Sequence, residues 1–135
     1  MFDTKIAIIV REDLAIWQKL NVTAFLTSGV LGANAALMGD SYEDADGQTY
    51  TPLIIQPVII LSTDGPGLKQ IHSRALARDV SLSLYIEEMF ATGHDAANRA
   101  VVRQYSTASL NIVGLALRDK RKIVDKITKG AKMHA

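Results

Sequence analysis

The sequence predicts an α/β domain in which helices cover both faces of a mostly parallel or mixed sheet. Four short apolar runs have the length of strands, and segments with helical periodicity separate them, which is typical of this fold class. The runs are almost continuously apolar, as strands buried on both faces are. They lie at residues 5–10, 53–61, 82–86 and 110–117. The 135 residues have the size of one compact domain, so we predict a single domain over residues 1–135.

The first predicted helix is long and covers about residues 15–38, with Gly39 as its terminator. Small residues recur in it at every fourth position and therefore lie in one stripe, where another backbone can approach closely. Two surfaces fit this stripe, the domain's own sheet or a helix of a second copy, and the spacing alone allows both. The stripe consists of Ala24, Ser28, Gly32 and Ala36.

The next segment, residues 40–52, is polar and acidic, and it predicts a short exposed hairpin. Its Asp46-Gly47 pair supplies the positive φ angles of a tight turn. A calcium-binding loop is the alternative, but that pattern needs ligand side chains where Tyr42 and Leu53 stand. The hairpin is therefore the better interpretation.

The remaining elements follow from proline placement and from helical spacing. Because proline lacks a backbone donor, Pro57 moves the start of the paired part of the second strand to Val58. Gly130 ends the last predicted helix. Three shorter helices are predicted, at about residues 68–78, 95–104 and 119–129.

Composition excludes several classes of site. The chain has no cysteine, which excludes disulfides, thiolate zinc sites, iron–sulfur clusters and a cysteine nucleophile. Its three histidines are scattered, so we predict no metal and no cofactor. Residues 20–38 carry no charge over the length of a membrane span, but they include five polar side chains and two glycines, so we predict no membrane segment. No targeting segment is recognisable, and the expected location is the cytoplasm.

Charge is distributed unevenly along the chain, although the formal net charge is only +1. Residues 1–68 hold three bases and eight acids, a net charge of −5. Residues 69–135 hold twelve bases and six acids, a net charge of +6. The basic half predicts a face for phosphate groups around residues 118–132. The near-neutral total argues against dense, non-specific nucleic-acid binding.

The residues that favour chemistry lie where predicted strands end. Lys19 opens the long helix after the first strand, and Glu87 and Glu88 end the third strand, shortly before Thr92. Ligands of α/β sheets gather outside the carboxyl ends of the strands. A lysine that meets a carboxylate and a hydroxyl there can polarise an ester carbonyl and orient a water molecule. The alternative interpretation is a salt bridge at the rim with no function.

Several segments, taken in order, resemble the peptidyl-tRNA hydrolase II superfamily. Residues 17–26 look most similar to an uncharacterised branch of it, a domain of unknown function. The resemblance covers nearly the whole chain and implies a three-layer α/β/α sandwich with a four-stranded mixed sheet, commonly a homodimer. It is carried by residues 5–19, 56–61, 68–80, 83–88, 111–117 and 119–129.

The resemblance implies hydrolysis of an aminoacyl- or peptidyl-tRNA-type ester, with tRNA as a partner. Lys19, Glu88 and Thr92 stand at the positions of the superfamily's catalytic lysine, aspartate and threonine. Because glutamate replaces aspartate, and threonine replaces a glutamine at position 23, the alternative is a non-catalytic homodimer that binds a small ligand or a protein. Ligand contacts are expected from Thr23, Glu87, His94 and Ser109.

Overall fold

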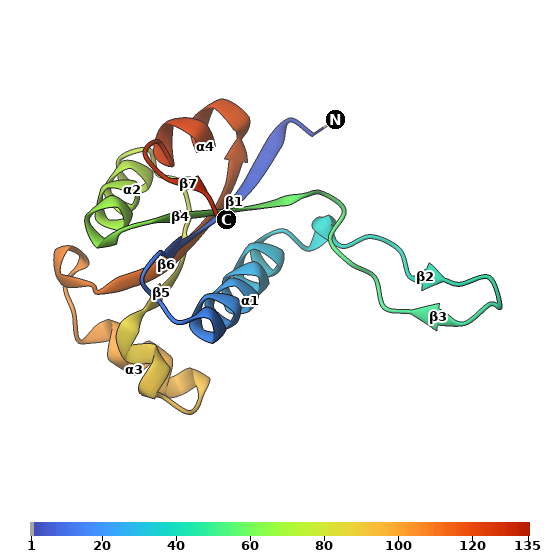
Figure 1. The fold of residues 1–135 in the computed structure, drawn as a ribbon, viewed down its shortest axis with the longest axis horizontal. Helices are drawn as coiled ribbons and strands as arrows, with labels where there is room; N and C mark the ends of the chain where they lie inside the picture. Colours follow the sequence, from blue (N-terminus) through green and yellow to red (C-terminus); the bar gives the residue numbers. More distant parts are fainter. Residues whose placement is uncertain (1) are drawn as a thin grey trace.

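The protein, described over residues 2–135 by a computed structural model, is built on a five-stranded mixed sheet (Figure 1). The strands are β1 (Thr4–Arg11), β4 (Val58–Thr63), β5 (Ser83–Ile86), β6 (Ile112–Lys120) and β7 (Lys132–Met133). Their order across the sheet is β5-β6-β1-β4-β7. β4 is parallel to β1, while β6 is antiparallel to both β1 and β5. The strands β1, β4 and β5 therefore point the same way, and their carboxyl ends meet at one edge of the sheet.

The prediction of a mixed sheet is confirmed, but the prediction of four strands is wrong because β7 adds a fifth. This strand has two residues and pairs antiparallel with Leu61 and Ser62 of β4. It follows a turn at Gly130, whose φ is +99°. Two residues are too few to show the alternation by which a strand is recognised in a sequence.

Helices pack on both faces of the sheet, as predicted, and the chain thus has three layers (Figure 1). Successive side chains of a strand point to opposite faces. Ile8 of β1 therefore packs on the face beneath α1, and Ile9 packs on the face beneath α2 and α4. The helices are α1 (Ile16–Ala33), α2 (Gly65–Ala77), α3 (Asp95–Arg103) and α4 (Arg121–Ile127).

The helix α1 contacts the sheet through a line of apolar residues that includes Val22 and Leu26. The stripe of small residues that includes Ala24 and Gly32 faces solvent instead. The interpretation that this stripe packs on the domain's own sheet is therefore wrong. Beneath Val22 the small residue belongs to the sheet, because a Cβ atom added at Gly114 of β6 would lie 2.5 Å from Cγ1 of Val22.

Several helix boundaries differ from the prediction. The helix α2 begins at Gly65, before the predicted start at residue 68, with Asp64 as its N-cap. The helix α1 ends at Ala33, before the predicted end at residue 38, and a 3-10 helix at Ala35–Leu37 continues the chain. The closing helix α4 begins later than predicted, because Asp119 and Lys120 extend β6. Across residues 2–135, no helix has the length and apolar character that crossing a bilayer requires.

The predicted hairpin is confirmed, and it projects from the body of the domain as an arm, which we define as residues 38–55 (Figure 1). The arm contains the short strands β2 (Tyr42–Glu43) and β3 (Thr49–Tyr50). Gly47 in the turn between them has a φ of +85°. The carboxylate of Asp44 accepts two backbone hydrogen bonds within the turn. The Asp-Gly pair thus has the turn function that the sequence indicated.

Candidate functional site

A cavity of about 750 Å³ lies between α1, β5 and α3. Its lining comes from one flank of α1, from β5, from the 3-10 helix Glu87–Ala91 that follows β5, and from α3. β5 is an edge strand of the sheet, and residues of α3 complete the lining. Gly29 allows α1 to approach β5 closely, because a Cβ atom there would lie 2.8 Å from Cβ of Ser83.

Aromatic side chains from three elements form an apolar wall of this cavity. The ring centroids of Trp17 and Phe90 are 5.9 Å apart, those of Phe25 and Tyr85 5.8 Å, and those of Tyr85 and Phe90 5.2 Å. These distances fall in the range at which aromatic pairs attract each other. Burial raises the pKa of the Tyr85 phenol, which keeps this group neutral. The cluster joins α1, β5 and the segment after β5 into one surface.

The segment that leads into α3 contributes a polar part of the lining. Nδ1 of His94 accepts a hydrogen bond from the backbone N–H of Ala97 at 3.2 Å and so caps α3. The hydroxyl of Thr92 donates to the carbonyl oxygen of Met89 at 2.8 Å and is in contact with the side chain of Asn98. Both predicted residues, Thr92 and His94, therefore line the cavity and help to position α3.

Two arginines of α3 also line the cavity. Arg99 forms an ion pair with Asp95 one turn earlier, at 2.5 Å. Arg103 has no ion-pair partner among residues 2–135. Arg103 is therefore a positive charge at the cavity that no carboxylate in the described part of the chain neutralises.

A separate polar cluster at the carboxyl edge of the sheet joins β1, β5 and β6. Arg11 donates from Nη2 to Oε1 of Glu87 at 3.0 Å, and Asn111 donates from Nδ2 to Oε2 of Glu87 at 2.6 Å. Burial by itself lowers the pKa of Arg11, but hydrogen bonds and charges of Asp13 and Glu87 outweigh it, so this pKa is raised. Both carboxylate oxygens of Glu87 are thus engaged in holding neighbouring strand ends together.

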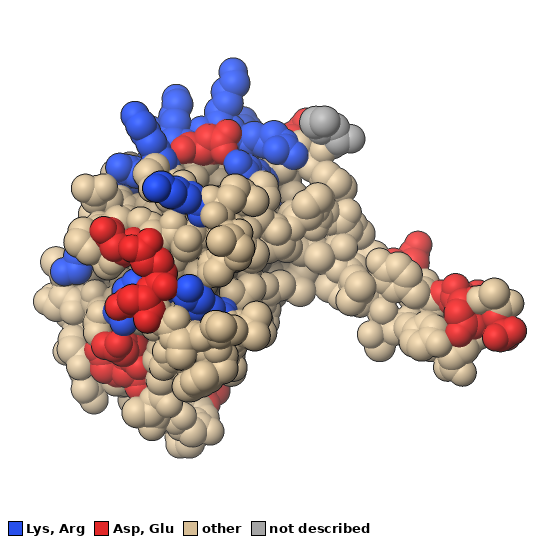
Figure 2. Space-filling model, viewed as in Figure 1, with Lys and Arg blue, Asp and Glu red and all other residues tan. Residues whose placement is uncertain are grey.

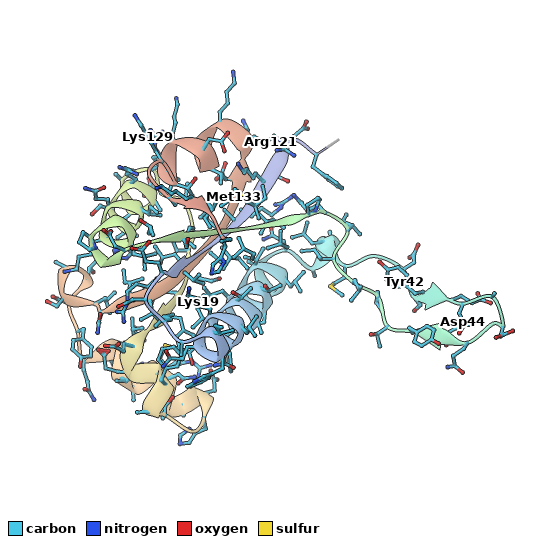
Figure 3. The ribbon with its side chains drawn as sticks, in the orientation of Figure 1. Lys19, Tyr42, Asp44, Arg121, Lys129 and Met133 are labelled. Carbon is cyan, nitrogen blue, oxygen red and sulfur yellow. The ribbon has the colours of Figure 1, made fainter. Side chains whose placement is uncertain are left out.

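Lys19 and Thr23 lie on the flank of α1 away from the cavity. At 3.6 residues per turn, Lys19 lies roughly 120° to 160° around the helix axis from Trp17 and Phe25. The hydroxyl of Thr23 donates to the carbonyl oxygen of Lys19 at 2.7 Å. The Lys19 side chain, labelled in Figure 3, is half-buried and forms no ion pair with any described residue. Neither residue lines the cavity that contains Thr92.

Glu88 and Ser109 are also outside the cavity lining. Oε2 of Glu88 is buried and has no hydrogen-bond partner within the described chain. Ser109 is exposed, and its hydroxyl lies 2.7 Å from that of Ser106. Of the seven predicted site residues, the structure brings Thr92 and His94 together in the cavity.

The sequence reasoning missed the aromatic wall and both arginines of α3. Trp17 and Phe25 are eight positions apart, which places them near one flank of a helix. That spacing could have indicated an apolar flank on the predicted first helix. Nothing in the sequence indicated that Tyr85 and Phe90 would lie beside it, because their proximity depends on the placement of β5.

Comparisons with known proteins identify a family but no activity. A family model described as a protein of unknown function, DUF2000, matches residues 4–135. A solved structure of a protein of unknown function from Agrobacterium tumefaciens is 60% identical, with a TM-score of 0.98 and coverage of 100% of both chains. No curated protein matches. Neither match names peptidyl-tRNA hydrolase II, so that resemblance stays a prediction. The chain belongs to the DUF2000 family, whose function is unknown.

Proposed function

We propose that the protein binds a small amphipathic anion, with an apolar ring system and one acidic group, in the cavity between α1, β5 and α3. The single observation that supports this proposal is that four aromatic side chains and Arg103, which has no ion pair with any described residue, line one cavity. The volume of the cavity, about 750 Å³, is within the range of about 300–1,000 Å³ that is usual for small-molecule sites.

The aromatic side chains of the lining would bind the apolar ring system of the ligand, and Arg103 would bind its acidic group. Aromatic side chains bury large apolar area, and each well-placed ring pair adds about 0.5–1.5 kcal/mol beyond that burial. Arg103 offers several N–H donors to a carboxylate, sulfonate or phosphate. Such charge-assisted hydrogen bonds are stronger than hydrogen bonds between neutral groups. The hydroxyl of Thr92 and the ring of His94 already have partners in the protein. Arg103 is therefore the principal anion contact.

The test compares two dyes that differ by one sulfonate, 1-anilinonaphthalene-8-sulfonate and neutral N-phenyl-1-naphthylamine. Both fluoresce when they bind in an apolar site, and both quench a nearby tryptophan by energy transfer. Trp17 is the only tryptophan of the chain, so quenching reports binding next to the cavity wall. Arg103→Gln is expected to weaken the binding of the sulfonate dye about tenfold, because a hydrogen bond to a charged group contributes about 1.5–3 kcal/mol. The neutral dye should bind the variant as well as it binds the wild type.

The control is Lys122→Gln, which removes a charge from the exposed surface of α4. This variant is expected to bind both dyes as the wild type does. Equal weakening of the two dyes by Arg103→Gln would instead mean that the variant alters the apolar wall. Binding without quenching of Trp17 would contradict the proposed location.

A second candidate function, hydrolysis of an aminoacyl- or peptidyl-tRNA-type ester, is favoured by Glu88. Its buried Oε2 has no partner in the described chain, and a free carboxylate oxygen can accept a hydrogen bond from an attacking water. Glu88 follows β5 and Lys19 follows β1, two strands that end at the same edge of the sheet. Arginines and lysines around α4 would hold the phosphates of the RNA.

The hydrolase candidate predicts that the purified protein deacylates peptidyl-tRNA. Lys19→Ala and Glu88→Gln should each lower the rate by about 10²–10⁴, the usual contribution of a positioned acid or base. Lys129→Ala, which removes a lysine just after α4, should change the KM for the RNA and not the turnover number. A wild-type protein that releases no amino acid above the uncatalysed rate would remove this candidate and leave the binding proposal unaffected.

A further inference from the structure

The helix α1 exposes an apolar face that the domain does not cover. Ile16 and Leu20 are exposed, Leu20 by 67% of its surface, and both lie on the flank of α1 away from the cavity. No residue from Leu20 to Gly39 is charged. A surface helix normally carries charged and polar side chains on its outward face, and a helix that is apolar all round is normally covered on all sides. The outward face of α1 therefore has the composition of an interface.

The arm also exposes apolar side chains that the body of the domain does not cover. Its apolar side chains Tyr42, Tyr50 and Leu53 are exposed, although they belong to a ribbon with well-defined pairing. The pairing extends along the arm, because the backbone N–H of Gly39 donates to the carbonyl oxygen of Leu53 at 2.9 Å. An isolated two-stranded ribbon is at best marginally stable in water, so ribbons of this kind generally pack against another surface. Figure 1 shows that the body of the same chain does not provide that surface.

We propose that the protein forms a two-fold dimer in which the arm of each copy lies along the outward face of α1 of the other copy. The apolar residues of the arm would cover the apolar residues of α1. The arm begins a few residues after α1 ends, so one two-fold axis near this junction generates both contacts at once. Such an interface is self-complementary and closed, and it leaves no unpaired arm to bind further copies.

The two surfaces match in length. The 18 residues of α1 extend over about 27 Å at 1.5 Å per residue. Each half of the arm, residues 38–46 and residues 47–55, extends over about 30 Å at about 3.3 Å per residue. An arm that starts at the carboxyl end of its partner's α1 therefore reaches the amino end of that helix.

Charge favours the same arrangement. The arm holds four acidic residues and no base, and Figure 2 shows these acids gathered toward its tip. In the dimer, this tip lies near the amino end of the partner helix, which carries a partial positive charge. Lys19, which has no ion pair among residues 2–135, lies near that end of the helix. The acids of the arm are Asp40, Glu43, Asp44 and Asp46.

The basic surface around α4 matches the arm less well than the outward face of α1 does. Figures 2 and 3 show lysines and arginines gathered over this helix, among them Arg121 and Lys129. Its outward side chains are charged, so it would attract the acids of the arm but would leave Tyr42 and Tyr50 uncovered. The face of α1 satisfies both requirements.

The experiment uses the absence of cysteine from the chain. Single-cysteine variants Leu20→Cys, on α1, and Tyr42→Cys, on the arm, are mixed and treated with a short bis-maleimide. We expect a cross-linked heterodimer from this mixture and none when Leu76→Cys, also an exposed position but on α2, replaces Leu20→Cys. By light scattering, the wild type should have twice the 14.7 kDa mass of one chain, and Leu20→Asp should have the mass of a monomer. Leu76→Asp should remain a dimer.

Each other outcome contradicts the proposal in a specific way. A wild type that is monomeric at the highest concentration reached rules out the dimer. Cross-linking of Tyr42→Cys to Lys122→Cys would place the arm on α4 instead. Cross-linking of two Leu20→Cys chains, without any to Tyr42→Cys, would indicate direct contact between two α1 helices. Circular dichroism of each variant verifies that the chain remains folded.

Discussion

Replacing Leu26 with alanine is expected to lower the free energy of unfolding by about 2–5 kcal/mol, the usual range for a fully buried leucine. Leu26 is 2% exposed and belongs to the core between α1 and the sheet, together with Val22 and Ile8. The substitution removes apolar contacts and leaves a cavity that the rigid sheet beneath cannot fill. Urea unfolding of the dilute protein, followed by circular dichroism, measures the difference.

The same substitution at Leu20 is the matched control. Leu20 lies on the same helix but on its outward face, where 67% of its surface is exposed. In protein diluted until it is monomeric, Leu20→Ala should change the free energy of unfolding by no more than about 0.5 kcal/mol. Equal losses from the two variants would contradict the orientation of α1. A loss from Leu20→Ala that appears only in concentrated protein would add support to the proposed dimer.

The sequence predicted the sheet, its helical cover and the hairpin because each of these has a local pattern. Continuous apolar runs form most of β1 and β6, and Asp46-Gly47 marks the turn by its backbone requirements alone. Pro57 correctly placed the start of β4 at Val58. In each case, a few neighbouring residues determine the local structure that forms.

The orientation of α1 was predicted less well, for a physical reason. Its residues are apolar or small on every side, so periodicity does not distinguish the face toward the sheet from the face toward solvent. The stripe of small residues suggested close packing, yet the tight contacts with the sheet are made elsewhere on the helix, where Val22 meets Gly114 and where Gly29 meets Ser83. The information that orients the helix therefore lies partly in β5 and β6, far away in the sequence.

The cavity could not be predicted from local patterns either. Trp17 and Tyr85 are far apart in the chain and lie in one aromatic cluster only because β5 forms the edge of the sheet beside α1. The position of Glu88 just after the third strand was correctly predicted from the end of that apolar run. The flank of α1 on which Lys19 would lie was not, because it depends on the rotation of the helix.

Gly114→Ala is expected to destabilise the fold by about 1–3 kcal/mol, the usual cost of overpacking a core. Elsewhere, replacing a glycine with alanine stabilises a protein by about 0.4–1 kcal/mol, because alanine restricts the unfolded chain. At Gly114 the new Cβ atom would lie 2.5 Å from Cγ1 of Val22 and 2.9 Å from Cδ1 of Leu26. Both neighbours are buried beneath α1, so the overlap is relieved when α1 moves away from the sheet.

Gly32→Ala in α1 shows what the same substitution does where there is room. A Cβ atom at Gly32 would meet no atom within 4 Å, and alanine is the better helix former by about 0.5–1 kcal/mol. In dilute protein we therefore expect Gly32→Ala to raise the urea midpoint and Gly114→Ala to lower it. Two changes of the same sign would contradict the close approach of α1 to Gly114. Because that contact sets the height of α1 above the sheet, Gly114→Ala should also weaken dye binding in the cavity, whereas Gly32→Ala should not.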